Sequence, residues 1–420
     1  MIRARSDGAL GSAVVRSSAA LILNTGLNAV LGFAFWVAAA RLLPPELVGA
    51  GAAAVSSMLF VASLGWAGMH FLLLRYVPAG GRDTLGLVIR AYAIAVALAA
   101  GLGIPFLALA GRQPDLAFLT ADALSILAFL GAVAIWVVFS LQDAVLVGIG
   151  RAGWVPAENL VFGIVKLVVL VALTSLATPW ALLAAWVGST IPLVIAVNWL
   201  IGSRARSTEP SRLPSRARLG RFWIEQHGIS LMVAAPDSLV PLLVIALLGP
   251  AANAHYYAAW TVSFSLRLLV VNIGSALTAE SAREGADRAR ASRDATRLAI
   301  ALIAPVVVGT VVVAPIVMAV YGEGYGAATD ALRLFGLGLV PFSIVNLFIA
   351  RRRVSERGGQ ALLVALVSMG VTLAVDAWAI PAFGITGAGL GWLVGWTAAA
   401  VPVVAIELSR RRAVVRSHTI

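Results

Sequence analysis

The chain has no cysteine and little charge, and both absences exclude whole classes of protein. Without cysteine it cannot form disulfides or hold iron–sulfur clusters, and thiol catalysis is excluded. Its four histidines are scattered without metal-ligand spacing, and no phosphate-binding loop is present to hydrolyse ATP. The expected outer connections, such as 249–254 and 383–386, are too short to carry the catalytic loop of a membrane polymerase. We therefore expect no enzyme.

Long apolar runs dominate what is present. Hydrophobic residues make up 60% of the chain and charged residues only 12%, with a mean hydropathy of +0.95, whereas a soluble domain is about 25% charged. A helix needs about 20 apolar residues to cross a bilayer. The sequence predicts an all-α membrane protein with twelve spans, near residues 17–40, 46–74, 85–110, 117–149, 154–177, 180–202, 222–248, 251–281, 298–320, 328–350, 359–381 and 384–408.

The arginines predict the orientation of these spans. Of the 31 basic residues, 26 fall on alternate connections, and only Arg41 and Arg112 fall on the others. Short loops rich in arginine stay in the cytoplasm. Both termini are therefore expected in the cytoplasm, with the protein in the plasma membrane. The net charge of +12 reflects these loops, and we expect membrane lipid, not nucleic acid, as the partner.

The second half of the chain repeats the first at an offset of about 205 residues. The repeat pairs Pro45 with Pro250, residues 150–153 with 356–359, and Trp186 with Trp392. Six spans per half give two parallel halves, an arrangement of transporters that place the pathway between the halves. We expect an N-terminal lobe at 1–202, an arginine-rich linker at 203–221, a C-terminal lobe at 222–409 and a tail at 410–420.

Three segments carry a family resemblance. Residues 40–46 (ARLLPPE), 321–325 (YGEGY) and 380–389 (IPAFGITGAG) resemble segments of the bacterial polysaccharide, or O-antigen, flippases. These belong to the multidrug, oligosaccharidyl-lipid and polysaccharide exporter (MOP) superfamily. The resemblance implies two six-helix lobes around a central cavity. It also implies alternating-access transfer of an undecaprenyl-pyrophosphate-linked oligosaccharide to the outer leaflet for lipopolysaccharide or exopolysaccharide synthesis, with a polymerase and glycosyltransferases as partners.

Two other groups of the superfamily fit the sequence less well than the polysaccharide flippases. Its lipid II flippases carry arginines in the first helix and have fourteen spans. This chain has no arginine between Arg16 and Arg41, which argues against a peptidoglycan-precursor role. A cation-coupled exporter of small amphipathic compounds remains the alternative, because charges of both signs are predicted within the spans.

Basic and amide side chains within the spans are candidates for the substrate site. Lys166 and Arg267 are expected near mid-depth and Arg333 near an outer end, where they could contact phosphates. Asn24 and Asn28 share a helix face and could bind sugar hydroxyls. The alternatives are snorkelling or structural pairing with carboxylates such as Asp143 or Glu158 for the bases, and contacts between helices for the asparagines.

Asp237 and Asp376 are the candidates for coupling to Na⁺ or H⁺, and we expect no other cofactor. Pro236 and Pro241 flank Asp237 and are expected to bend or unwind its helix, leaving carbonyls free beside the carboxylate. The alternative role for Asp237 is as counter-ion to a buried arginine. Gly387, Gly391 and Gly395 recur every four residues and predict close helix packing.

Overall fold

The protein is built from helices. The computed structural model describes residues 26–205, 207–281, 288–354 and 358–417, and all regular structure in these residues is helical. Ten helices are long and apolar enough to cross a membrane, and a shorter apolar helix is also present. The helices are Gly26–Leu42, α2 (Pro45–Trp66), α3 (Met69–Tyr76), α4 (Thr84–Ala110), α5 (Ala123–Gly148), α6 (Trp154–Leu173), α7 (Trp180–Arg204), α8 (Arg216–Leu248), α9 (Pro250–Ser281), α10 (Arg288–Tyr321), α11 (Thr329–Val354), α12 (Gly358–Phe383) and α13 (Ile385–Ser417).

Each predicted span coincides with a helix in the described residues, with three corrections. The second span is two helices, α2 and α3, because the chain breaks at Gly68, whose φ of +75° suits glycine. The fourth span begins at Ala123, since Pro114–Thr120 forms a 3₁₀ turn. The seventh begins at Arg216 and runs unbroken through both prolines, so the predicted unwinding is wrong. Packing against other helices lets a membrane helix tolerate proline.

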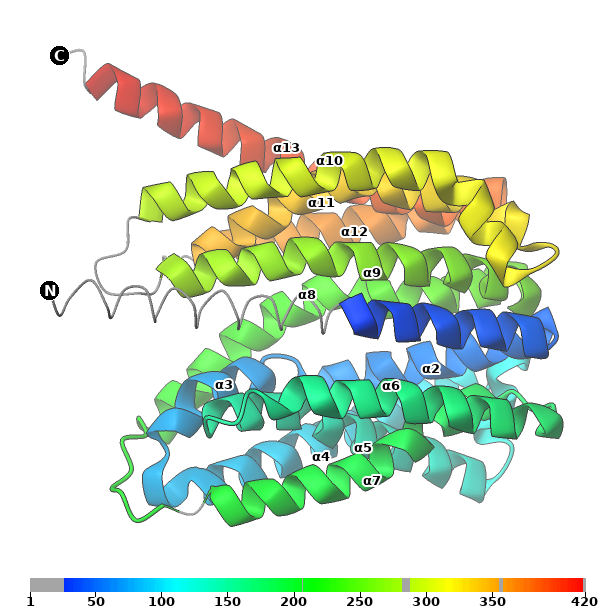
Figure 1. Cartoon of the computed structure of the whole chain (residues 1–420), viewed down its shortest axis with the longest axis horizontal. Helices are drawn as coiled ribbons and strands as arrows, with labels where there is room; N and C mark the ends of the chain where they lie inside the picture. The colour runs from blue at the N-terminus through cyan, green and yellow to red at the C-terminus, as the bar shows by residue number, and fades with distance from the viewer. Residues whose placement is uncertain (1–25, 206, 282–287, 355–357, 418–420) are drawn as a thin grey trace, which may run out of the picture.

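The helices form two bundles, which Figure 1 shows one above the other. The N-lobe comprises Gly26–Leu42 and α2 to α7, and the C-lobe comprises α8 to α13. In the C-lobe, α12 and α13 pack along their length. A side chain at Gly391 of α13 would collide with Asp376 of α12, since a Cβ there would lie 1.8 Å from Asp376 Oδ1. The predicted role of this glycine repeat in packing is confirmed.

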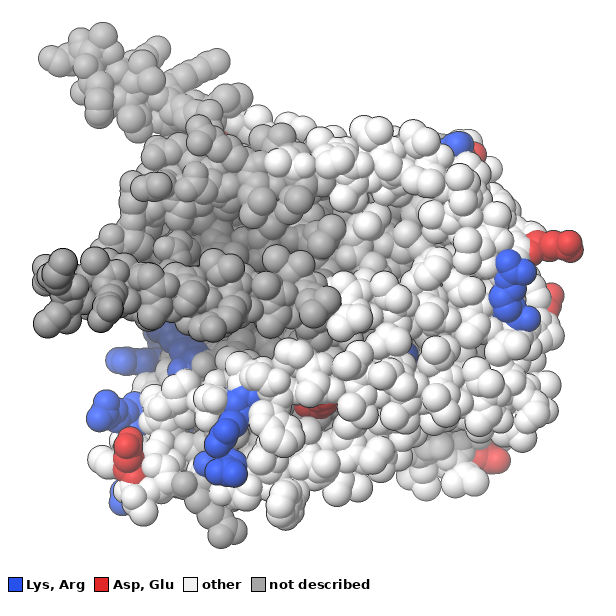
Figure 2. Space-filling model, viewed as in Figure 1, with Lys and Arg blue, Asp and Glu red and all other residues white. Residues whose placement is uncertain are grey.

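Charge separates the two ends of the molecule. The basic end carries the connections at 75–83, 149–153 and 205–215, and the opposite end carries those at 43–44, 111–122 and 322–328. Figure 2 shows most of the exposed arginine atoms at the basic end, on the left, basic and acidic atoms together at the opposite end, and few charged atoms on the described surface between them. An apolar belt bounded by polar ends is the surface that a bilayer requires.

The lobes touch at both ends. At the basic end α8 lies against the N-lobe: the Arg75 guanidinium lies 5.0 Å from the Phe222 ring centroid, and His227 Nδ1 hydrogen bonds to the Ala67 carbonyl. At the opposite end Asn253 Nδ2 donates to the Gly49 carbonyl at 2.8 Å. Arg41 Nη2 donates to the Val320 carbonyl at 2.8 Å. In this conformation the lobes are therefore in contact at either end.

Candidate functional site

A buried ammonium group lies inside the N-lobe. Lys166, the only lysine of the chain, is 6% exposed on α6. Its Nζ lies 4.4 Å from the ring centroid of Trp186, 4.6 Å from that of Phe162 and 4.8 Å from that of Phe35. Among the described residues it forms no ion pair. The three rings offset part of the cost of burying an ammonium group, but none of them carries a negative charge, so the site favours an anion.

A buried guanidinium occupies the C-lobe. Arg267 on α9 is 4% exposed, and its Nη1 donates to Asp237 Oδ1 of α8 at 2.9 Å. Its Cζ lies 4.1 Å from the ring centroid of Trp260 and 4.5 Å from that of Trp392. Nε and Nη2 have no hydrogen-bond partner in the described residues. The guanidinium thus keeps donors for a further acceptor.

The ion pair identifies one of the two roles expected for Asp237. Its carboxylate is the counter-ion of Arg267. Pro241 has no N–H to donate to the carbonyl of Asp237, four residues earlier in α8. A free carbonyl beside a carboxylate is a ligand set that suits Na⁺. Ion coupling at Asp237 stays a prediction.

The two buried cations contact repeat-related tryptophans. Trp186 of α7 and Trp392 of α13 stand 206 residues apart (392 − 186) at matching places in the two halves. The cations themselves come from helices that do not correspond, α6 and α9. Position 372, the counterpart of Lys166 at the same offset, is a threonine. Each lobe therefore places a cation beside the repeat-related tryptophan, but from α6 in the N-lobe and from α9 in the C-lobe.

Asp376 is enclosed between α12 and α13. Its side chain is fully buried, and neither carboxylate oxygen has a hydrogen-bond partner in the described residues. It packs on Gly391, and Thr372 lies one helical turn away on α12. A buried carboxylate without partners is strongly disfavoured when ionised, so this position suits a bound proton or cation.

A polar cluster in the N-lobe was not expected as a unit. Gln142 Nε2 donates to Glu158 Oε1, Asn198 Nδ2 donates to Gln142 Oε1 at 3.1 Å, and Asn159 Nδ2 donates to Asp143 Oδ2 at 3.5 Å. The carboxylates therefore accept from amide groups of α5 and α6, and not from Lys166, while Asn198 of α7 joins the cluster through Gln142. The signal lay in two polar pairs, 142–143 and 158–159, on either side of the tight turn at 149–153. A helical hairpin places such pairs opposite each other.

The remaining candidates lie elsewhere. Arg333 stands at the opposite end, where Nη1 pairs with Asp330 Oδ1 at 2.9 Å and Nε donates to the Val311 carbonyl at 3.2 Å. Its side chain is 41% exposed, which favours the snorkelling alternative. Asn28 is half-buried on the helix Gly26–Leu42, and Asn24 lies outside the described residues. The described part of the chain holds no group of three or more acidic or histidine residues arranged for a metal ion.

Two comparisons with known proteins match this chain. The model of the family described as "Lipid II flippase MurJ" matches residues 240–419, the C-terminal part. Among curated proteins no relative matches. Among solved structures, MATE in complex with MaL6 is 15% identical and covers 96% of this chain and 97% of its own, with a TM-score of 0.66.

Two further structures agree. Lipid II flippase MurJ in an inward closed conformation is 12% identical, covers 91% of this chain and 86% of its own, and has a TM-score of 0.66. A MOP superfamily transporter from Pyrococcus furiosus, for which the reverse polarity of its binding pocket suggests a different function, is 17% identical, covers 96% of both chains and has a TM-score of 0.67. The chain has the fold of MOP-superfamily transporters.

Proposed function

We propose that the protein is an alternating-access flippase that moves an undecaprenyl-pyrophosphate-linked oligosaccharide from the inner to the outer leaflet for surface polysaccharide synthesis. Lys166 is the observation that carries this proposal. A buried ammonium group with aromatic neighbours and no described counter-ion favours an anionic group such as a pyrophosphate. The match of the C-terminal part to a lipid II flippase family supports a lipid-linked sugar as the substrate class.

The charged residues take separate roles in this mechanism. Lys166 in the N-lobe and Arg267 in the C-lobe would engage the phosphates as the lobes open toward the cytoplasm, with Asn24, Asn28 and the tryptophan rings near the sugars. Arg333 would act at the outer end. Asp376 and Asp237 would bind the coupling ion, Na⁺ or H⁺, and its release would reset the lobes. The basic end would face the cytoplasm, in line with the excess of arginine there.

The decisive experiment uses cells of the native host that lack this gene. We expect surface polysaccharide to be lost and its undecaprenyl-linked precursor to accumulate on the cytoplasmic face. Wild type and Lys166→Arg should restore export, whereas Lys166→Ala and Arg267→Ala should not. Arg112→Gln removes a cation from the connection between α4 and α5, at the opposite end of the N-lobe, and serves as the control. Unchanged polysaccharide in the deletion strain would refute the proposal.

Two rival substrates give other outcomes in the same strain. The family match over 240–419 favours a peptidoglycan precursor, whose accumulation with failure of wall growth would identify that cargo. The buried carboxylates Glu158 and Asp376 and the half-buried Asp143 favour a cation-coupled exporter of small amphipathic compounds. In that case the deletion strain would become sensitive to cationic compounds and keep its polysaccharide.

A further inference from the structure

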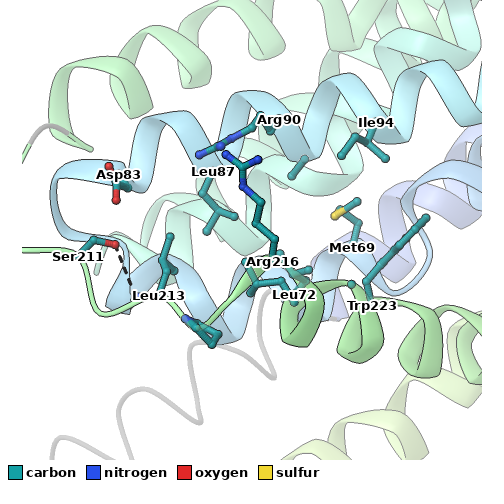
Figure 3. A pocket seen from close by; sticks show the side chains of 14 residues that line it. Met69, Leu72, Asp83, Leu87, Arg90, Ile94, Ser211, Leu213, Arg216 and Trp223 are labelled. Carbon is teal, nitrogen blue, oxygen red and sulfur yellow. Dashed lines mark hydrogen bonds between the residues drawn. The ribbon is translucent and has the colours of Figure 1, made fainter.

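A cavity of about 720 Å³ lies at the basic end, between the N-lobe and the start of α8. Figure 3 shows α3 and α4 on one side of it, and the connection 205–215 with the first turns of α8 on the other. Two hydrogen bonds tie that connection to the N-lobe: Arg82 N–H donates to the Glu209 carbonyl and Arg212 N–H donates to the Ala79 carbonyl, each at 2.9 Å. The cavity is therefore built from both lobes.

Two guanidinium groups converge on this cavity. Arg90 comes from α4 and Arg216 is the first residue of α8, and Figure 3 shows their side chains pointing toward each other. Arg90 Nε donates to the Gly86 carbonyl at 2.9 Å, which fixes its direction. Neither arginine forms an ion pair with a described residue. Like charges brought together from separate elements favour an anion between them, and the guanidinium geometry suits phosphate oxygens.

Apart from Asp83 and Ser211, the rest of the lining is apolar and runs toward the membrane interior. Its wall includes Met69, Leu72, Leu87 and Leu213. The eleven residue steps from Asp83, just before α4, to Ile94 span about 16 Å, and Ile94 is 51% exposed. Trp223 also lines the cavity, and its buried indole N–H has no hydrogen-bond partner in the described residues. The polar end of the cavity suits a lipid head group, and the apolar wall that continues from it suits an acyl chain.

We propose that this pocket binds one anionic phospholipid from the surrounding leaflet, with its phosphate between Arg90 and Arg216 and an acyl chain along α4. The charges on the lining sum to +1, from two arginines and Asp83. That sum matches a phosphodiester with one negative charge better than a pyrophosphate. Figure 3 places Asp83 and Ser211 at the end away from Trp223, where they can hydrogen bond to the hydroxyls of a glycerol head group.

The bound lipid would join the lobes at the basic end. It contacts α4 of the N-lobe and α8 of the C-lobe at once, so it stabilises the conformation in which α8 lies against α3. Basic pockets between membrane helices are known to bind anionic head groups. Opening the lobes at this end would separate Arg90 from Arg216 and release the lipid. The site thus regulates conformation, whichever substrate the protein carries.

Native mass spectrometry of the full-length protein with phosphatidylglycerol tests the proposal. We expect one lipid retained per chain, and a rise in melting temperature as this lipid is added to the detergent. Arg90→Gln and Arg216→Gln should each weaken retention about tenfold or more, because each removes a charge-assisted hydrogen bond. Arg218→Gln, on α8 outside the cavity lining, should match wild type, and Arg216→Lys should retain part of the binding.

Other ligands test whether the pocket requires an anionic lipid or binds any lipid or a soluble phosphate. Phosphatidylcholine and phosphatidylethanolamine, which carry no net charge, should bind less tightly than phosphatidylglycerol. Soluble glycerol phosphate should leave the melting temperature unchanged, because it lacks the chain. Equal retention of all three lipids, equal retention by the double variant Arg90→Gln/Arg216→Gln, or an equal effect of glycerol phosphate would each overturn the proposal.

Discussion

Trp186 and Trp392 occupy matching places in the two halves of the chain, and each ring faces a buried cation. Lys166 Nζ lies 4.4 Å from the Trp186 ring centroid, and Arg267 Cζ lies 4.5 Å from that of Trp392. The two halves therefore share the aromatic partner, whereas the cation comes from α6 in one half and from α9 in the other. Under the proposed function, this arrangement would offer a negatively charged group one cation from each lobe.

Lys166→Met should separate function from stability. Methionine has a similar length without the charge, so the variant removes the desolvation of a buried ammonium group. We expect its melting temperature to stay close to that of wild type, because the lost cation–π contacts and the avoided burial of a charge oppose each other, whereas transport should be at least tenfold slower. Melting temperature in detergent and flipping of a fluorescent lipid-linked oligosaccharide in proteoliposomes measure the two effects. A variant that is less stable but transports normally would show that Lys166 is structural.

The Arg267–Asp237 ion pair gives a double-mutant cycle. Arg267→Met leaves a buried carboxylate unpaired, and breaking such a pair costs about 3–5 kcal/mol. The double variant Arg267→Met/Asp237→Asn should regain most of that stability, because no buried charge remains. Thermal unfolding of the four proteins measures the coupling. If the double variant is as unstable as the sum of the single ones, the two residues do not interact.

Gly391→Ala should destabilise the contact between α12 and α13. The added Cβ would lie 1.8 Å from Asp376 Oδ1, so the buried Asp376 side chain or one of the two helices must shift. Gly370→Ala on α12 is the matched control: nothing lies within 4 Å of its Cβ, and alanine in a helix gains about 1 kcal/mol over glycine. We expect opposite changes in melting temperature. Adding Asp376→Ala should restore part of the melting temperature that Gly391→Ala loses. If it restores none, the collision with Asp376 is not the cause of the loss.

Asn253→Ala should loosen the lobes at the opposite end. The variant loses the hydrogen bond to the Gly49 carbonyl, worth about 1 kcal/mol, which shifts the ratio of closed to open forms about fivefold. Because the chain has no cysteine, Ser56→Cys gives a single reporter on α2 at a position that is 1% exposed. Its reaction with an impermeant maleimide should become faster in the Asn253→Ala background.

Thr261→Ala is the control for this measurement, because the Thr261 hydroxyl bonds within its own helix, to the Tyr257 carbonyl at 2.8 Å. Its labelling rate should equal that of the parent. Equal rates in the Asn253→Ala and Thr261→Ala backgrounds would mean that the Asn253 hydrogen bond does not hold the lobes together.

Most of the fold could be predicted from the sequence because membrane insertion depends on local features. The apolar runs predicted the spans, and the repeat that pairs Pro45 with Pro250 predicted the two halves. The predictions were wrong where hydropathy or the effect of proline on a helix did not decide the structure. Gly68 breaks a run that is apolar throughout, and α8 passes through Pro236 and Pro241, because neighbouring helices stabilise a helix that has lost backbone hydrogen bonds.

The candidate site was predictable only in part. A charged residue in an apolar run is visible in the sequence, so Lys166, Arg267, Asp237 and Asp376 could be named. Their surroundings could not. The choice of Asp237 as the partner of Arg267, the aromatic neighbours of Lys166, and the meeting of Arg90 with Arg216 all depend on which helices are neighbours. By itself the sequence determined where the apolar runs lie and which charged residues fall within them, because hydropathy acts residue by residue. The tertiary structure alone decided which charges meet, because residues distant in the chain become partners only when helices pack.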